Sequence, residues 1–348
     1  MTVITADRKL QRVERPLPTC GPGEVLVRSA ITGICGTDIE LLHGTRPAKL
    51  TRYPVAPGHE WSGVVTGTGI AVTGVAQGDR VACEARFHCD ACARCRAGQT
   101  NLCSAGYEEL GFTRDGGLSE YVAVPTRLVH KLPEDLPLDA AALLEPAAVV
   151  VHAFLRCAPP PGSVVAVVGD GTIGQLAVQT ARCWSAAAVS IVGAVPSRLA
   201  MARATGAAVA YDVREGAAES WFRETVAADG ADLVIEAAGN PDAVGLALRM
   251  ARPGGSVALI GAAGTDAAPC RLDSDVFVLN DLRVHGICGS VPAAWDLAIG
   301  LAATGRLSLG RLISHRYSVT EAAAAYRTVE SRATGTMKVV LVHDWAAA

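Results

Sequence analysis

The second half of the chain carries the pattern that most limits its possible folds, because short apolar runs alternate there with segments of helical character. Runs typical of buried β-strands occupy residues 163–168, 188–192, 231–236 and 255–260, and helices are expected at 174–183, 198–205 and 242–250. Such alternation is typical of a doubly wound sheet of parallel strands with helices on its faces. The sequence therefore predicts an α/β fold, with this sheet in a domain over residues 154–284.

The first 153 residues differ, because short β-like runs are separated there by turns that contain Gly and Pro. A further strand is expected at 337–342, near the C-terminus. At 348 residues the chain is long enough for two domains, each with its own core. We therefore expect residues 1–153 and 285–348 to form one mainly-β domain, into which the domain of residues 154–284 is inserted.

The charge balance and the apolar segments exclude several classes of protein. With 31 Lys and Arg against 34 Asp and Glu, the formal charge is −3, so we expect no nucleic-acid or anionic-membrane partner. The longest apolar stretch, residues 140–155, is interrupted by Glu145, Pro146 and His152 and is too short to span a bilayer. No secretory signal is visible at the N-terminus. These features predict a cytoplasmic protein whose partner is a small molecule.

Four cysteines lie within fifteen residues, at Cys89, Cys92, Cys95 and Cys103. Without a secretory signal, clustered cysteines favour a metal over disulfides. Four thiolates at this spacing can close a tetrahedron around Zn²⁺ with no open position, as in a structural zinc site. An iron–sulfur cluster fits less well, because its usual fourth cysteine follows after three residues and precedes proline, whereas Cys103 precedes Ser104. Thiols without a common ligand are the other alternative.

Three separate segments each offer one further ligand type, at Cys35, His59 and Glu145. Taken singly, such a cysteine or histidine is most often structural. Glu145 is harder to explain in that way, because it lies in an apolar run and a buried carboxylate needs a partner. Together, a thiolate, an imidazole and a carboxylate would leave Zn²⁺ one open position, the arrangement of a catalytic zinc. The residues alone leave both interpretations open.

A glycine motif follows the strand at 163–168 and opens the next helix, with the sequence Gly169-Asp170-Gly171-Thr172-Ile173-Gly174. The first glycine permits a tight turn, the second lets the backbone approach a pyrophosphate, and the third lets the helix pack closely on the strand. The N-terminus of the helix then offers N–H groups to the phosphates. The motif predicts a Rossmann-type domain that binds a dinucleotide.

The second strand of this domain lacks the acidic residue that usually holds the ribose 2′-hydroxyl. Gly193 stands at the expected position, and the next two residues are not acidic either. Without that carboxylate nothing repels a 2′-phosphate, and Ser197, Arg198 and Tyr211 offer donors or a stacking surface, although Arg198 can equally be a solvated helix start. We therefore expect NAD(P) as cofactor, with NADP favoured, and expect Gly193→Asp to shift the preference toward NAD.

Eight segments, in the same order along the chain, resemble the zinc-dependent medium-chain dehydrogenase/reductase family of alcohol, polyol and sugar dehydrogenases. They are Gly33-Ile-Cys-Gly-Thr-Asp, Pro57-Gly-His-Glu, the four-cysteine segment, Asp115-Gly-Gly-Leu-Ser-Glu-Tyr, Leu144-Glu-Pro, the glycine motif, Ile235-Glu-Ala-Ala-Gly and Arg252-Pro-Gly-Gly. The resemblance implies that the mainly-β domain is GroES-like. It implies one catalytic and one structural zinc, and an assembly as a homodimer or homotetramer.

The resemblance also assigns roles to residues near the predicted catalytic zinc. It implies that Cys35, His59 and Glu145 bind the metal, and that Glu60 lies beside it or exchanges onto it. Thr37 matches the hydroxyl that takes the proton of the alcohol. Glu40 stands where many relatives have a histidine that completes this proton relay, and the pattern Cys-Gly-Thr-Asp-x-Glu resembles the glucose dehydrogenase branch. Asp38 is expected to hold the Cys35 loop through backbone hydrogen bonds.

The implied function is reversible hydride transfer between NAD(P) and a secondary alcohol of a polyol, sugar or cyclitol. An enzyme acting on an amino alcohol such as threonine, or on a simple secondary alcohol, is the nearest alternative. A redox-silent nucleotide-binding protein is a further alternative, which intact Cys35, His59 and Glu145 count against. Arg46 and Arg52 could meet an acidic or phosphorylated substrate, but the more common explanation is that they are surface arginines.

Overall fold

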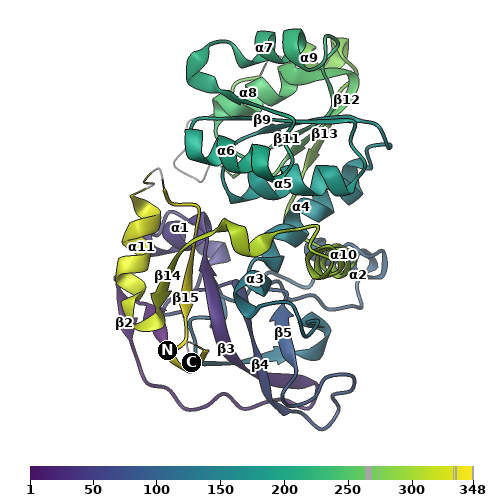
Figure 1. Ribbon diagram of the computed structural model, residues 1–348. Helices are drawn as coiled ribbons and strands as arrows, with labels where there is room; N and C mark the ends of the chain where they lie inside the picture. Colours follow the sequence, from purple (N-terminus) through teal and green to yellow (C-terminus); the bar gives the residue numbers. More distant parts are fainter. Residues whose placement is uncertain (263–268, 273, 332, 334, 347–348) are drawn as a thin grey trace. The chain divides into compact units, whose positions relative to one another are not determined.

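The computed structural model describes residues 1–262, 269–272, 274–331, 333 and 335–346. The chain divides into two compact units (Figure 1). The β-rich unit comprises Met1–Glu145, Val291–Ala303 and Leu309–Ala348, and the inserted unit comprises Pro146–Ser290 and Thr304–Ser308. The expected junction between residues 153 and 154 falls inside helix α4 (Leu144–Cys157), whereas the structure divides the chain near the start of that helix.

The inserted unit is built on a six-stranded parallel sheet in the order β10-β9-β8-β11-β12-β13. Numbered along the chain this is the order 3-2-1-4-5-6, which confirms the Rossmann-type, doubly wound α/β fold. The strands are β8 (Val164–Val168), β9 (Ala188–Gly193), β10 (Val209–Asp212), β11 (Ala231–Glu236), β12 (Ala251–Leu259) and β13 (Arg283–Gly286). The helices between them are α5 (Thr172–Cys183), α6 (Pro196–Thr205), α7 (Ala218–Thr225), α8 (Pro241–Met250) and α9 (Asp275–Leu279).

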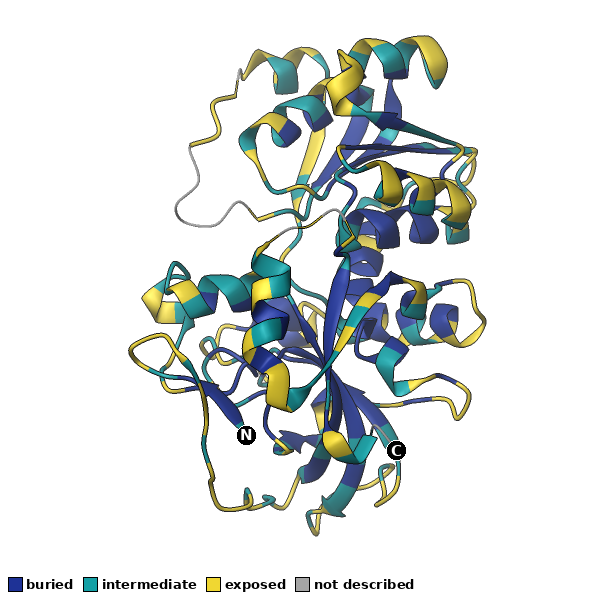
Figure 2. Cartoon of the chain, turned by 60° about the vertical axis from the view of Figure 1, so that its left-hand side comes forward, coloured by how far each residue is buried: buried dark blue, intermediate teal, exposed yellow. Residues whose placement is uncertain are grey.

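The two edge strands, β10 and β13, were not predicted, for a physical reason. A central strand is covered on both faces and so reads as a continuous apolar run, as the sequence of β8 does. β10 has only four residues, and β13 is mostly exposed, so neither carries such a run. The core of the inserted unit instead joins the central strands to α7 and α8, through side chains such as Phe222 and Met250. In Figure 2 the central strands of this sheet are coloured as buried.

The β-rich unit contains a seven-stranded sheet in the order β14-β15-β3-β4-β5-β7, with β6 paired to β3, and a separate two-stranded sheet of β1 and β2. The bounds are β1 (Thr2–Ile4), β2 (Leu10–Arg12), β3 (Glu24–Ile34), β4 (Glu60–Thr68), β5 (Arg80–Cys83), β6 (Tyr121–Pro125), β7 (Val129–Lys131), β14 (Ile313–Ser318) and β15 (Lys338–Val342). Because β15 pairs with β3, the C-terminal segment completes a sheet that begins near the N-terminus.

Helices cover parts of this sheet. These are α3 (Leu138–Ala141), which contacts β3, β4 and β5, and α11 (Ala322–Glu330), which contacts β14 and β15. The unit also contains α1 (Gly36–His43), α2 (Ala93–Arg96) and α10 (Pro292–Ala303). Trp61 on β4 is almost fully buried in the core of the unit, together with valines of β3, β5 and β6. In the part of the chain that the structure describes, no helix is both long and apolar enough to cross a membrane.

Candidate functional site

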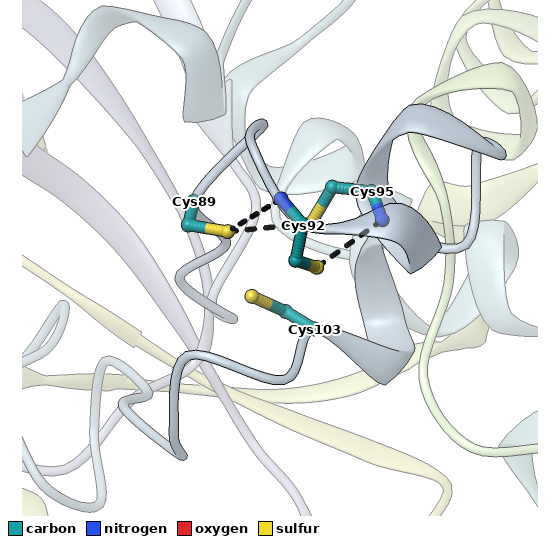
Figure 3. Close-up of side chains that lie close together, drawn as sticks. All are labelled: Cys89, Cys92, Cys95 and Cys103. Carbon is teal, nitrogen blue, oxygen red and sulfur yellow. Dashed lines mark hydrogen bonds between the residues drawn. The ribbon is translucent and has the colours of Figure 1, made fainter.

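The four cysteines of residues 89–103 lie together around the short helix α2 (Figure 3). Their four sulfur atoms all lie within 4.8 Å of one another. Backbone N–H groups donate to three of them: Cys92 to Cys89 Sγ at 3.3 Å, Cys95 to Cys92 Sγ at 3.4 Å, and Ala105 to Cys103 Sγ at 3.5 Å. Such donors stabilise thiolates, which are the metal-binding form of cysteine.

The spacing of these thiols favours a cation between them. Hydrogen bonds from the N–H groups of Ser104 and Cys95 lower the pKa of Cys92 to about 5, whereas burial raises the pKa of Cys95 to about 12. Four thiolates this close repel one another unless a positive charge lies between them. A set of four sulfurs is a ligand set that Zn²⁺ prefers, and it leaves no position for a substrate. The cluster therefore fits a structural zinc.

Cys35, His59 and Glu60 form a second cluster, because two antiparallel strands meet at this point. β3 pairs with β4 so that Gly33 lies opposite Glu60, which brings the residue after β3 next to the first residue of β4. Cys35 follows β3 and caps α1, and His59 precedes β4. One ligand atom of each of the three residues lies within 4.8 Å of the others. Sulfur, nitrogen and oxygen ligands in one cluster fit a zinc that keeps an open position.

The buried Asp38 orients this cluster, and its expected bond to the Cys35 loop is confirmed. Asp38 Oδ2 accepts the N–H of Cys35 at 2.9 Å, and Oδ1 lies 3.5 Å from His59 Nδ1. A carboxylate beside Nδ1 leaves Nε2 as the nitrogen for a metal. Burial opposes protonation of His59, but the Asp38 charge outweighs it and raises the pKa well above its ordinary value. Metal binding there would therefore release a proton.

Glu60 carries a second buried contact, with Lys338 on β15. The Lys338 ammonium donates to both carboxylate oxygens, at 2.8 and 2.7 Å, and to the carbonyl oxygen of Ile34 at 3.2 Å. Both side chains are almost completely buried, at 5% and 1% exposure. Burial alone would lower the pKa of Lys338, but the Glu60 carboxylate outweighs this and raises it. The negative charge of Glu60 in the cluster is therefore balanced by the ammonium group of Lys338, in the C-terminal segment.

Glu145 lies near this cluster but outside the group formed by Cys35, His59 and Glu60. It stands in the first turn of α4. Burial raises the pKa of its carboxyl to about 7, although the charge of His59 acts in the opposite direction; repulsion by Glu60 adds to the increase. The two glutamates thus differ in their surroundings, because Glu60 is paired with a lysine, whereas burial raises the pKa of Glu145 above its ordinary value.

The predicted relay residues lie on α1, directly after Cys35. Thr37 Oγ1 is 3.5 Å from His59 Nε2, the nitrogen that faces away from Asp38. Glu40 lies one turn further along α1, where its charge contributes to the raised pKa of Arg46 against the lowering effect of burial. The structure therefore brings Thr37 to the cluster and Glu40 to the neighbouring arginine.

A polar cluster of Arg46, Tyr107 and Glu109 lies beside Phe112, close to His59. The Phe112 ring is 4.9 Å from the His59 ring, and the Arg46 guanidinium lies 3.9 Å from the Phe112 centroid. Arg46 donates to Tyr107 Oη at 2.8 Å, Tyr107 donates to Glu109, and Arg46 lies 3.7 Å from Glu109. The Arg46 side chain is only 13% exposed, so the interpretation as a surface arginine is wrong. Arg52 is exposed.

The glycine motif lies between β8 and α5, as predicted. Gln175 N–H bonds to the Gly171 carbonyl, so the preceding N–H groups of the first turn, from Thr172 to Gly174, have no intrahelical acceptor. A Cβ on Gly174 would lie 1.9 Å from the Gly169 oxygen, whereas a Cβ on Gly171 would meet no described atom within 4 Å. The helix is therefore packed tightly onto the loop, while the backbone at Gly171 stays open, as a pyrophosphate site requires.

The end of β9 differs from the expectation, because Asp170 lies against Gly193. Asp170 Oδ2 accepts the N–H groups of Ala194 and Val195 at 2.8 and 2.7 Å. Its Oδ1 lies 3.5 Å from Arg198 Nη1. A Cβ on Gly193 would come within 2.5 Å of Asp170 Cβ and Oδ2. Gly193→Asp would thus displace Asp170 rather than simply add an acid, which the expected shift toward NAD did not take into account.

The remaining predicted cofactor residues are divided between surface and core. Ser197 is exposed in the first turn of α6, next to Arg198. Tyr211 on β10 belongs to the core of the inserted unit, only 9% exposed, and its ring stacks on Trp221 with a centroid distance of 4.5 Å. The structure therefore brings Gly193 and Arg198 to Asp170, and leaves the Tyr211 ring as a core residue.

Comparisons with known proteins agree with this geometry. The family model for the alcohol dehydrogenase GroES-like domain matches residues 21–134, and the model for the zinc-binding dehydrogenase domain matches residues 172–304. L-threonine 3-dehydrogenase of Streptomyces coelicolor is 35% identical over 345 residues, which cover 98% of each chain. The chain belongs to the zinc-dependent medium-chain dehydrogenase/reductase family.

This medium-chain dehydrogenase/reductase is also similar to solved structures. Galactitol-1-phosphate dehydrogenase from Escherichia coli is 31% identical with a TM-score of 0.88, covering 98% of this chain and 99% of that one. A protein from Sinorhizobium meliloti, described as a zinc-binding dehydrogenase and solved with NADP, is 32% identical with a TM-score of 0.90, covering 98% of each. The protein is an oxidoreductase of the zinc-dependent alcohol dehydrogenase type, and the mainly-β unit is GroES-like as predicted.

Sequence reasoning missed several residues of this medium-chain dehydrogenase/reductase that the structure brings to its sites. Lys338 is one of them, and its signal was a charged residue in the otherwise apolar run 337–342. Tyr107 is another, and no local signal marks it. Asp170 was included only as a member of the glycine motif, and its contact with the end of β9 depends on the parallel pairing of β8 with β9.

Proposed function

We propose that the protein transfers a hydride reversibly between a secondary alcohol of a polyol, sugar or cyclitol and a nicotinamide dinucleotide. The observation that carries the proposal is the cluster of Cys35, His59 and Glu60, whose ligand atoms lie within 4.8 Å of one another. The chain that holds it also has a Rossmann-type glycine loop. A zinc hydrolase would need the first feature but not the second.

In this proposal Cys35 and His59 hold the catalytic zinc, with Glu145 or Glu60 as the third ligand. The zinc supplies Lewis acidity, which lowers the pKa of a hydroxyl group that binds to it. Asp38 orients His59 and secures the Cys35 backbone. Thr37 Oγ1, next to His59, accepts the proton that the substrate hydroxyl loses and passes it on.

The hydride acceptor is a nicotinamide dinucleotide whose pyrophosphate binds the first-turn N–H groups of α5. The nicotinamide ring supplies the carbon that takes up the hydride. Which dinucleotide the protein prefers depends on the end of β9, where Gly193 by itself predicts NADP but the Asp170 carboxylate lies close by. The four-cysteine cluster holds a second zinc with a structural role.

The polar cluster near His59 supports a substrate with several hydroxyl groups. Arg46 and Tyr107 offer donors, and Glu109 offers an acceptor. The charge of Arg46 is balanced by Glu109, so the cluster has no surplus positive charge for a carboxylate or a phosphate. The second candidate substrate is an amino alcohol such as threonine, favoured by the similarity to L-threonine 3-dehydrogenase. Glu109 would then face the ammonium group.

We further propose a homodimer or homotetramer and a cytoplasmic location. The edge strand β13 is largely exposed, and the nearby Val278 and Leu279 are 76% and 80% exposed. An exposed strand edge with apolar neighbours favours pairing with a second copy. Cysteines that cluster as metal ligands favour a reducing compartment. Nothing in the charge balance favours a nucleic-acid partner.

The test is a panel of polyols, sugars, cyclitols, L-threonine and simple secondary alcohols, each assayed with NAD and NADP by nicotinamide absorbance. Turnover of a polyol or sugar with higher kcat/KM than L-threonine supports the proposal. Cys35→Ser and His59→Ala are expected to abolish turnover while the dinucleotide still binds, and Cys20→Ser, a cysteine outside both clusters, keeps it. Near-normal oxidation by either of the first two variants would contradict the zinc assignment.

A further inference from the structure

A carboxylate lies at the end of β9, although no residue of β9 is acidic. It belongs to Asp170, which stands in the glycine loop after β8. Gly193 is the last residue of β9, and in a Rossmann-type sheet the residue at this point contacts the ribose of the adenosine half. A Cβ on Gly193 would point at the Asp170 side chain, 2.5 Å from its Oδ2. Asp170 therefore occupies the volume that an acidic side chain on residue 193 would fill.

Hydrogen bonds hold the Asp170 carboxylate in this position. Oδ2 accepts the N–H groups of Ala194 and Val195, the first two residues after β9. The backbone carbonyl of Asp170 is held as well, because it accepts from Gln175 Nε2, which also donates to the carbonyl of Arg198. The Asp170 side chain is only 10% exposed, so it is part of a built loop and not a solvated surface acid.

A 2′-phosphate at this place would meet unfavourable chemistry. The N–H groups of Ala194 and Val195, directly after β9, already donate to Asp170, and the carboxylate itself repels a second anion. The nearby cation, Arg198, lies 3.5 Å from Asp170 Oδ1, which offsets its charge. A ribose 2′-hydroxyl would instead find an acceptor, because Oδ1 receives neither of these two N–H groups.

We propose that Asp170, contributed by the glycine loop, replaces the acidic residue missing from the end of β9 and selects NAD(H) over NADP(H). This inference rests on the proposed dinucleotide-dependent function and names the specificity-determining residue of the same site. It reverses the preference expected from Gly193 alone, because the carboxylate reaches the end of the second strand from the first βα loop.

Binding constants of the zinc-loaded full-length protein test this directly, measured by titration with NADH and with NADPH and followed by nicotinamide fluorescence. The wild-type protein is expected to bind NADH at least about tenfold more tightly than NADPH. Asp170→Asn keeps the shape and the acceptor for Ala194 and Val195 but removes the charge. It is expected to shift the ratio of the two dissociation constants toward NADPH by about tenfold or more.

Two further variants separate this role from general effects. Asp170→Ser combined with Gly193→Asp moves the carboxylate from the loop to the strand and is expected to restore the preference for NADH. Asp212→Asn removes an acid at the end of the neighbouring strand, where Arg214 pairs with it, and is expected to leave the ratio unchanged within about twofold.

The possible results distinguish this inference from the function on which it rests. If the wild-type protein binds neither dinucleotide, the proposed function fails and the inference fails with it. If both bind and the wild-type protein prefers NADPH, or Asp170→Asn leaves the ratio unchanged, only the role of Asp170 is refuted. A shift of equal size in Asp212→Asn would also refute it, since diffuse charge would then explain the effect.

Discussion

Replacing Lys338 with methionine is expected to destabilise the β-rich unit by about 3–5 kcal/mol. The Lys338 ammonium lies 2.7 and 2.8 Å from the two oxygens of Glu60, and both side chains are almost fully buried. At an effective dielectric constant of about 20, charges at this separation attract by roughly 6 kcal/mol. Methionine fills similar space but leaves the Glu60 carboxylate buried without its partner, and that unpaired charge is the main source of the loss.

Equilibrium urea unfolding of the zinc-loaded protein, followed by tryptophan fluorescence, measures this free energy of unfolding. The matched control is the double variant Lys338→Met with Glu60→Gln, which removes both charges. It is expected to recover most of the lost stability, because a neutral pair carries no uncompensated buried charge. The reasoning is refuted if the single variant loses less than about 1 kcal/mol, or if the double variant loses the sum of the two single losses.

Further expected outcomes concern other parts of the molecule. Cys103→Ser should lower the zinc content by about one ion per chain and reduce the melting temperature, as measured by metal analysis and thermal unfolding; an unchanged zinc content would contradict a four-cysteine site. Gly174→Ala places a Cβ 1.9 Å from a loop carbonyl and should weaken NADH binding in a fluorescence titration, whereas Gly300→Ala, which meets no described atom within 4 Å, should not. Tyr107→Phe should raise KM for a polyol but not for 2-propanol, and an equal effect on both would exclude a role in substrate selection. Burial lowers the pKa of His343 in the folded protein, although the hydrogen bond with the Gly117 carbonyl opposes this. As the pH falls below about 6.5, His343 is therefore protonated in the unfolded chain before it is protonated in the folded one. Stability should therefore decrease from that pH downward by up to about 1.4 kcal/mol per unit, and His343→Gln should flatten the decrease in urea unfolding at several pH values.

Local patterns explain why much of the fold could be predicted. The apolar runs at β8, β9 and β11 reflect strands covered on both faces, and the glycine motif reflects steric limits within one loop. The edge strand β13 could not be predicted, because half-solvated strands carry no continuous apolar run. Tyr211 was predicted to contact the cofactor but packs on Trp221 in the core. The sequence could not separate these roles, because the residues around a single tyrosine do not show whether it binds a ligand or packs in a core.

The sequence by itself determined the four-cysteine segment, the glycine loop and the α/β class, because each depends on residues that are close in the chain or on a period of the backbone. The ligands of the second predicted metal site lie in separate segments, and the residues alone left that site open. Only the tertiary structure decided which charges face one another. Lys338 reaches Glu60 because β15 pairs with β3, and Asp170 reaches Gly193 because β8 pairs with β9. Such pairs join residues whose separation in the chain carries no signal, and their energies depend on burial that only the folded chain creates.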